Sequence, residues 1–291
     1  MSDLILAFRL PAVLLRYREL MFAFVHRELK ARIEGSILGR VWPVLQPAVL
    51  FAIYYMVFVK LLKIGFTDQL APHGAEEWAK GWRSTFYLIT GILPWTALAE
   101  TLSRGTGVVL ENSNLIKKIA FPSELLPVYQ VIVYHVYFLV GFAVLVIIEA
   151  VINGGLPVAL LWFPVVLLVQ MMLVTGLTMM CSAANVFIRD VMQAVPILLV
   201  FWMFTTPVFW DLSAISQSGA VSDDAFLDNA ATWMRYNPMA ILLGIYRSIF
   251  SYGHIPFPVL GLGKLLLGSA GVLWIGYAYF LRSKGRFADE V

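Results

Sequence analysis

The sequence predicts an all-helical protein that crosses a membrane six times. Hydrophobic residues make up 60% of the 291 residues, charged residues only 13%, and the mean hydropathy is +0.81. A water-soluble domain of this size needs a far more polar surface. The chain also contains six long apolar stretches, and about 20 apolar residues are enough for one helix to cross the hydrocarbon core of a bilayer.

Residues 1–42 precede the first apolar stretch and form a predicted cytoplasmic N-terminal segment. They hold seven basic and four acidic residues. Among these charges, Val13, Tyr17, Leu20, Phe24 and Val25 recur near a helical period. This pattern predicts an amphipathic helix that lies in the membrane interface with its apolar side facing the lipid. The alternative is an amphipathic helix that packs on the protein itself.

The remaining residues, 43–291, form the predicted transmembrane domain. Its six spans are expected at residues 44–62, 85–102, 125–152, 156–187, 191–209 and 257–281. Pro94 lies inside the second span, and Pro196 and Pro207 bound the fifth. No cleavable signal peptide is visible, because the apolar run at residues 4–8 is too short. We therefore expect the first span to remain as an uncleaved anchor.

The distribution of lysine and arginine predicts the orientation of these spans. Cytoplasmic connections of membrane proteins retain an excess of both residue types. With the N-terminus inside, fourteen of the 21 basic residues lie on the cytoplasmic side. We therefore expect a multi-pass membrane protein with both termini in the cytoplasm.

Two connections between the spans carry features beyond simple linkage. Residues 105–124, called here the coupling segment, are polar and basic and lie on the cytoplasmic side. Residues 211–256 form a long outer connection whose second half turns apolar around Asn237 and Pro238. Because this apolar part is too short to cross, it predicts a re-entrant or interfacial hairpin between the fifth and sixth spans. Such hairpins are tolerated where they are buried or line a wet cavity, which indicates a pore or exit.

The sequence offers little for catalysis. It has no phosphate-binding P-loop, and its four histidines are scattered without metal-ligand spacing. Cys181 is the single cysteine, and a bond from His135 to a neighbouring helix is favoured over a proton relay. We expect no catalytic residue, cofactor, metal or nucleic-acid partner. A membrane enzyme acting on lipid-linked sugars and a proton-coupled carrier stay open as alternative classes.

Aromatic residues mark a candidate substrate path. The C–H faces of sugars stack on aromatic rings, while tyrosine and tryptophan can also hydrogen-bond sugar hydroxyls. Interfacial belts explain other aromatics of the chain, but for those well inside a span, groove lining and helix packing are equally open. Arg40 at the inner mouth suits an anionic group of a substrate, and snorkelling at a helix end explains it almost as well. The candidate path residues are Arg40, Tyr54, Tyr55, Phe58, Phe201, Trp202, Phe204, Trp210 and Tyr236.

Several motifs resemble those of a known family. The sequences RELKAR at 27–32 and GSILGRVWPVLQP at 35–47 precede or begin the first span. They are followed by ENSNLIKKIAFP at 111–122, NVFIRDV at 185–191, PVFW at 207–210 and YNPM at 236–239. In this order the motifs resemble permeases of type-two ABC exporters, and more narrowly the branch that exports capsule, O-antigen and teichoic-acid polysaccharides.

The resemblance implies partners and a substrate. Two copies of the chain would form a homodimer around a central path in the bacterial inner membrane, among its lipids. Two copies of a separate ATPase subunit, which binds ATP and magnesium, would dock beneath them. The substrate would be a lipid-linked polysaccharide, with capsular polysaccharide as the first expectation and O-antigen or teichoic acid as alternatives. The chain itself would be a transport subunit and not an enzyme.

The resemblance also implies where the ATPase binds. The coupling segment would supply a coupling helix that fits a groove on the ATPase. Basic residues there suit an acidic patch on that subunit or anionic lipid headgroups, and retention of positive charge inside explains them equally well. The candidate coupling residues are Asn114, Leu115, Lys117, Lys118, Phe121 and Arg189.

One segment departs from the family pattern. Residues 64–83 are longer and more charged than the family leads us to expect of a first outer loop. We expect that this loop either contacts an additional periplasmic or outer-membrane export partner or has no role.

Overall fold

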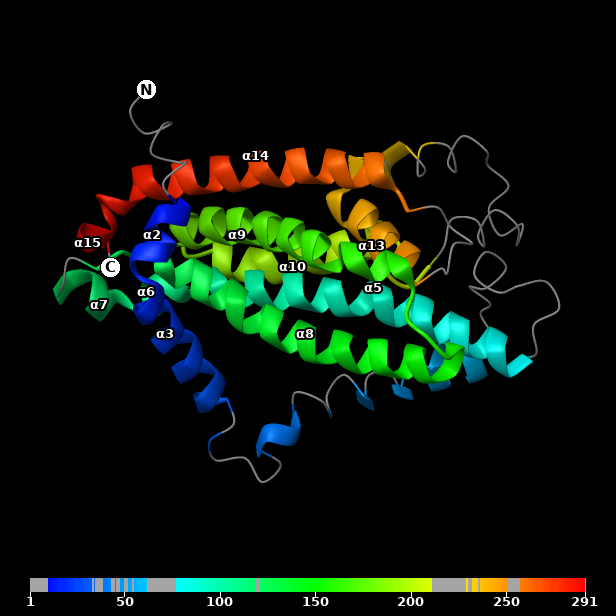
Figure 1. Cartoon of the computed structure of the whole chain (residues 1–291). Coiled ribbons are helices and arrows are strands. Elements are labelled where there is room, and N and C mark those ends of the chain that lie inside the picture. Colours follow the sequence, from blue (N-terminus) through cyan, green and yellow to red (C-terminus); the bar gives the residue numbers. More distant parts are fainter. Residues whose placement is uncertain are drawn as a thin grey trace.

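Helices are the only regular secondary structure in the part of the chain that the computed structural model describes (Figure 1). The described residues are 10–32, 34, 39–42, 45, 48–49, 52–53, 55–61, 77–118, 121–210, 229, 232–234, 236–250 and 257–290. Three described helices are long and apolar enough to cross a membrane, namely Leu125–Ile152, Val158–Phe187 and Val259–Lys284. An all-helical fold with several membrane-length helices is therefore confirmed.

Four long helices and two shorter apolar ones build the bundle. The long ones are α5 (Glu77–Gly105), α8 (Leu125–Asn153), α9 (Phe163–Phe187) and α14 (Val259–Lys284). The shorter ones are α10 (Val191–Thr205) and α13 (Pro238–Ile249), and the 3-10 helix η4 (Val158–Trp162) leads into α9. The predicted third, fourth and sixth spans therefore agree with α8, η4 with α9, and α14.

The other predicted spans need correction. The second was expected at 85–102, but α5 already begins at Glu77, so the expected loop at 64–83 is wrong for residues 77–83. Polar residues there ended the apolar run without ending the helix. The fifth was expected to reach residue 209, but α10 ends at Thr205. Thr206 has an extended backbone with ψ 138°, as the steric demand of the following Pro207 favours.

The predicted first span lies mostly outside the described residues. Its described part includes the π-helix η3 (Tyr55–Leu61), which packs on α5, and the 3-10 helix η2 (Gly39–Val41) precedes it. The short helices α2 (Leu10–Arg16) and α3 (Arg18–Ala31) lie at the end of the bundle where α5 finishes, whereas α5 starts at the opposite end (Figure 1). The chain therefore passes from one end to the other between Ala31 and Glu77, the interval of the predicted first span.

The two ends of the bundle differ in what they carry. One end, called here the α7 end, holds α2, α3, α6 (Val108–Glu111), α7 (Ser113–Lys118) and α15 (Phe287–Glu290), while α13 lies toward the other, the α13 end (Figure 1). The first and last described helices thus share one end. This arrangement agrees with an even number of crossings and with termini on the same side.

The predicted amphipathic N-terminal helix is present as α2 and α3, which Tyr17 separates. Its apolar side packs on the protein, because Met21, Phe24 and Val25 are buried and Phe24 stacks on Tyr129 of α8 at 5.4 Å between ring centroids. This supports packing on the protein for that side of the helix. Leu15 and Phe22 are both 72% exposed, and the location of the helix in a membrane interface stays a prediction.

Close contact between backbones joins α9 to α14. A Cβ atom built on Gly176 would lie 2.5 Å from the carbonyl oxygen of Val272, and one built on Gly276 would collide with the backbone of Gly176. Small residues allow transmembrane helices to approach closely, which supplies packing that lipid cannot supply. The absence of a side chain at these two positions is therefore a condition of this packing.

Replacing Gly276 with leucine should separate α9 from α14 and lower the free energy of unfolding by about 2 kcal/mol, as overpacked cores do. The measurement is thermal unfolding of the purified protein in detergent. Gly268→Leu is the matched control, because it lies on the same helix and a Cβ atom there meets nothing within 4 Å. Equal unfolding temperatures for the two variants would contradict the role of this contact.

Candidate functional site

The coupling segment folds as two short helices at the α7 end. After α5 ends, α6 inserts Val108 and Val109, both fully buried, into the hydrophobic cluster at this end. In α7, Leu115 packs on the same cluster, while Asn114 and Lys117 are exposed. The segment is thus anchored by its apolar side and presents a polar side outward, which is the arrangement that a docking helix requires.

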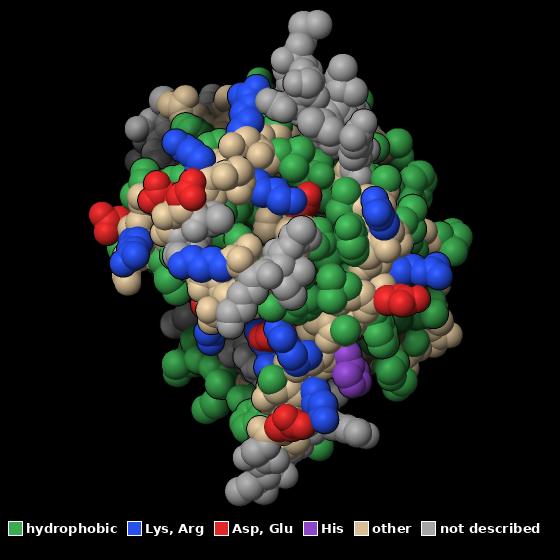
Figure 2. Space-filling model, turned by 90° about the vertical axis from the view of Figure 1, so that its left-hand side faces the viewer, with side chains coloured by type: hydrophobic (Ala, Val, Ile, Leu, Met, Phe, Trp, Pro, Cys, Tyr) green, Lys and Arg blue, Asp and Glu red, His purple; other side chains and the backbone are tan. Residues whose placement is uncertain are grey.

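The remaining candidate coupling residues lie around α7. Phe121 is half-buried and packs edge-to-face on Phe24 of α3, with 5.7 Å between the ring centroids. Arg189 is exposed in the turn between α9 and α10. The side chain of Lys118 lies outside the described residues. Figure 2 shows this end of the molecule, where charged side chains of both signs are scattered among hydrophobic ones.

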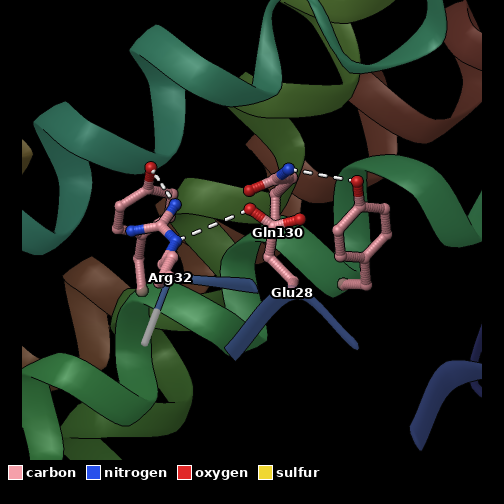
Figure 3. A network of polar contacts seen from close by, with 5 residues as sticks. Glu28, Arg32 and Gln130 are labelled. Carbon is pink, nitrogen blue, oxygen red and sulfur yellow. Dashed lines mark hydrogen bonds and ion pairs between the residues drawn. The ribbon is translucent and has the colours of Figure 1, made fainter. Parts of the chain in front are cut away.

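A polar network fixes the end of α3 to α8 (Figure 3). The Arg32 guanidinium donates from Nη2 to the Tyr134 hydroxyl at 2.6 Å, and its Nε lies 3.5 Å from a carboxylate oxygen of Glu28. It also lies 4.4 Å from the ring centroid of Tyr134 and 5.4 Å from that of Tyr137. Burial lowers the pKa of Arg32, but the Tyr134 bond and nearby groups outweigh it and leave the pKa above its ordinary value. The cation is therefore permanent.

At the start of α13, one asparagine joins that helix to α10. Asn237 caps α13, because its Oδ1 accepts from the backbone nitrogen of Met239 at 3.0 Å. The same oxygen accepts from Trp202 Nε1 at 3.1 Å, and Asn237 Nδ2 donates to Thr206 Oγ1 at 2.9 Å. The residue sequence Asn-Pro suits this place, since proline is favoured in the first helical turn.

A buried arginine ties α13 to two further elements. Arg247 donates from Nη2 to the carbonyl oxygens of Pro207 at 2.7 Å and Val208 at 3.2 Å, just after α10. Its guanidinium lies 3.6 Å from the centroid of the Tyr87 ring on α5. Tyr87 in turn donates its hydroxyl to the carbonyl oxygen of Trp210 at 3.1 Å. The last residues before the outer connection are thus held from two sides.

A buried glutamine adds a second attachment for α13. Tyr246 donates its hydroxyl to Gln170 Oε1 at 2.6 Å, and Gln170 Nε2 donates to the carbonyl oxygen of Pro94 at 3.3 Å. Nine of the twelve residues of α13 are buried, and the helix packs on α5, α9 and α14. A short apolar helix buried among spans fits the expected re-entrant element, although residues 211–228 and 251–256 of the hairpin lie outside the described chain.

Five of the nine candidate path residues gather near α10 and the start of α13. Trp202 is half-buried, bonds Asn237 and packs edge-to-face on Trp95 at 5.7 Å. Trp210 is also half-buried and donates Nε1 to the carbonyl oxygen of Phe204 at 3.1 Å. The other three side chains are exposed by 64% or more, namely Phe201, Phe204 and Tyr236.

The other four candidates are elsewhere or lie outside the description. Tyr55 is half-buried in η3, where Lys60 Nζ lies 5.8 Å from its ring centroid. Arg40 belongs to η2 and Phe58 to η3, but their side chains lie outside the described part, as does all of Tyr54. The structure therefore assembles only the half of the candidate path that α10 carries.

The most strongly held polar residues were missed as site residues. Arg247 and Gln170 are buried polar side chains in apolar helices, and such residues are expensive in a membrane unless they are paired. That cost was the signal that could have singled them out. Among the described residues, no group of three or more His, Cys, Asp or Glu side chains could hold a metal ion.

Residues 19–251 match the family described as ABC-2 type transporter. The chain belongs to this family. The predicted resemblance to type-two ABC exporters is thereby confirmed, and the chain is the multi-pass membrane subunit of an ABC transporter. It is a transport protein that works with a separate ATPase subunit, and it is not itself an enzyme or a cofactor carrier.

The chain is also similar over almost its whole length to proteins named O-antigen export system permease protein RfbA. One, from Myxococcus xanthus, is 28% identical over 285 residues, which cover 97% of this chain and 99% of that protein. Two from Klebsiella pneumoniae are 22% and 24% identical, each covering 93% of this chain and 94% of the relative.

Replacing Arg247 with methionine should lower the free energy of unfolding by about 3 kcal/mol, because two buried carbonyl oxygens lose the donor they have in the structure. Tyr87→Phe removes one hydrogen bond but keeps the ring under the guanidinium, so its effect should be near 1 kcal/mol. Denaturant unfolding in detergent measures both. An Arg247→Met protein as stable as Tyr87→Phe would contradict the role assigned to the arginine.

Proposed function

We propose that the chain is the membrane subunit of an ATP-driven exporter that moves a lipid-linked O-antigen polysaccharide across the bacterial inner membrane. The observation that carries this proposal is the nearly full-length similarity to three O-antigen export permeases. It favours O-antigen, the alternative substrate of the sequence prediction, over the capsular polysaccharide that came first there. Teichoic acid has no support of this kind.

Docking of the ATPase at the α7 end agrees with the charges of the described residues. Exposed bases at this end include Lys117, Arg189 and Arg282. Because cytoplasmic connections retain positive charge, this end faces the cytoplasm in our proposal, with both termini there. The polar side of α7 then points toward the ATPase pair, and closure of that pair displaces α7 while the packed helices follow as a body.

The outward face of α10 supports a homodimer around a path. Apolar side chains more than half exposed follow one another along this helix, namely Ile197, Leu198, Val200, Phe201 and Phe204. In our proposal a second copy of the chain lies across from this face, and the two helices flank the path. Phe201, Phe204 and Tyr236 then offer stacking surfaces to successive sugars, so that no deep binding site has to form and be emptied.

Reversing the charge of Lys117 should weaken assembly with the ATPase, because the exposed side of α7 would then repel an acidic patch. The Lys117→Glu protein should retain roughly one fifth of the ATPase in co-purification, as expected for a charged contact at an interface rim. Lys264→Glu is the control, since this exposed lysine lies on α14 away from the α7 end. Undiminished co-purification of Lys117→Glu would remove Lys117 from the docking surface.

Removing an exposed aromatic ring from α10 should slow export without affecting assembly. Phe201→Ala and Phe204→Ala should each lower the export rate by about threefold, within the range of a lost stacking contact. Ile197→Ala is a matched control, because Ile197 is 71% exposed and lies one turn from Phe201. The assay follows glycolipid transport into vesicles by the complete complex. Equal rates for all three variants would exclude these rings from the path.

A further inference from the structure

The end of the chain folds back against the coupling segment. Beyond α14, a turn leads into α15, which packs on α7 and α9 at the α7 end (Figure 1). Phe287 is fully buried there, with its ring centroid 5.2 Å from that of Phe280 and 6.3 Å from that of Phe187. The hydrophobic cluster that takes up Phe287 also includes Leu115 of α7. One apolar side chain thus joins the C-terminal helix to the coupling helix.

An ion pair holds the other side of the coupling segment. Lys284, the last residue of α14, places Nζ 2.6 Å from Glu124 Oε2. Glu124 is the last residue of the coupling segment and immediately precedes α8. Its side chain is only 8% exposed, whereas that of Lys284 is 35% exposed. Removing the lysine would leave a buried carboxylate without this partner, which is the costly way to break such a pair.

The helix that carries Lys284 continues to the other end of the molecule. It packs on α9 through the backbone contact at Gly176 and Gly276, so the two helices cannot slide past each other without losing that fit. Toward the α13 end, α14 also packs on α13. A continuous chain of contacts therefore links the coupling segment, α14 and the buried helix α13.

We propose that residues 282–290, called here the C-terminal strap, fasten the coupling segment to α14, with Lys284 and Phe287 as positioning residues. The strap makes α14 the helix that receives the movement of α7 and delivers it to α13. This inference rests on the proposed function, because the movement comes from the docked ATPase. It assigns to the C-terminal residues a part in converting ATP hydrolysis into export.

The test compares charge reversals in the complete complex, reconstituted in vesicles with O-antigen glycolipid. Lys284→Glu and Glu124→Lys should each lower the glycolipid exported per ATP hydrolysed by roughly fivefold, and the double charge swap should restore the ratio to within about twofold. Arg282→Glu is the matched control, because Arg282 is an exposed cation two residues from Lys284. A purely structural role would lower assembly and leave the ratio of the assembled complex unchanged.

A second measurement does not depend on variants with reversed charges. Glu124→Cys and Lys284→Cys are combined in a Cys181→Ser chain and joined by a short thiol crosslinker. Because the strap keeps the two positions together throughout the cycle, the crosslinked complex should export at the rate of the reduced one. Export that stops on crosslinking and returns on its release would overturn the strap.

The outcomes separate the inference from the function on which it rests. Single reversals that match Arg282→Glu, or a charge swap worse than either reversal, would overturn the strap while leaving O-antigen export intact. If instead the unaltered complex hydrolyses ATP but moves no O-antigen glycolipid, the proposed substrate fails. In that case the crosslinked pair still tests the strap through ATP hydrolysis, which crosslinking should leave unchanged if the inference holds and suppress if it fails.

Discussion

The described bundle depends on the contact between Gly176 of α9 and Gly276 of α14, where two backbones touch. In a membrane, apolar side chains gain little by leaving lipid for a helix interface, so close packing has to supply the attraction. The other described elements are arranged around this pair. Helix α13 packs on both α9 and α14, and α15 folds back from the end of α14. A rigid pair of long helices thus connects the end that carries α7 to the end that carries α13.

Polar contacts at the two ends complete what the glycine contact begins. Toward one end, Arg247, Gln170 and Asn237 attach a short buried helix to its neighbours by hydrogen bonds. At the other end, Arg32 and Lys284 fix the N-terminal helix and the end of α14 to the two sides of α8. Each contact satisfies a buried or half-buried polar group, which explains why such residues are tolerated in so apolar a chain. Between the ends, the helices move as a body or hardly at all.

Much of this architecture could be predicted from the sequence. Runs of apolar residues located α8, α9 and α14 closely, because lipid imposes the same length and composition on every crossing. The motif at residues 111–122 located the coupling helix, and Asn237-Pro238 marked the start of α13. The end of α10 at Thr205 was missed, since the apolar run continues past the point where Pro207 stops the helix.

The candidate sites were harder to predict for a physical reason. Hydropathy reports how much a residue avoids water but not which partner it has, so Arg247 was noted only as an interruption of an apolar run. Its partners on α5 and after α10 are distant in sequence, and only the fold brings them together. The same holds for Lys284 and Glu124, which are 160 residues apart. Aromatic residues on α10 were found because their type alone carries the signal.

The central claim is that this chain supplies a path and its partner supplies the work. The most direct test reconstitutes the chain in vesicles with and without the ATPase subunit and follows entry of an O-antigen glycolipid. The account predicts transport only when both subunits and ATP are present. Sustained uphill transport by the chain alone would contradict it.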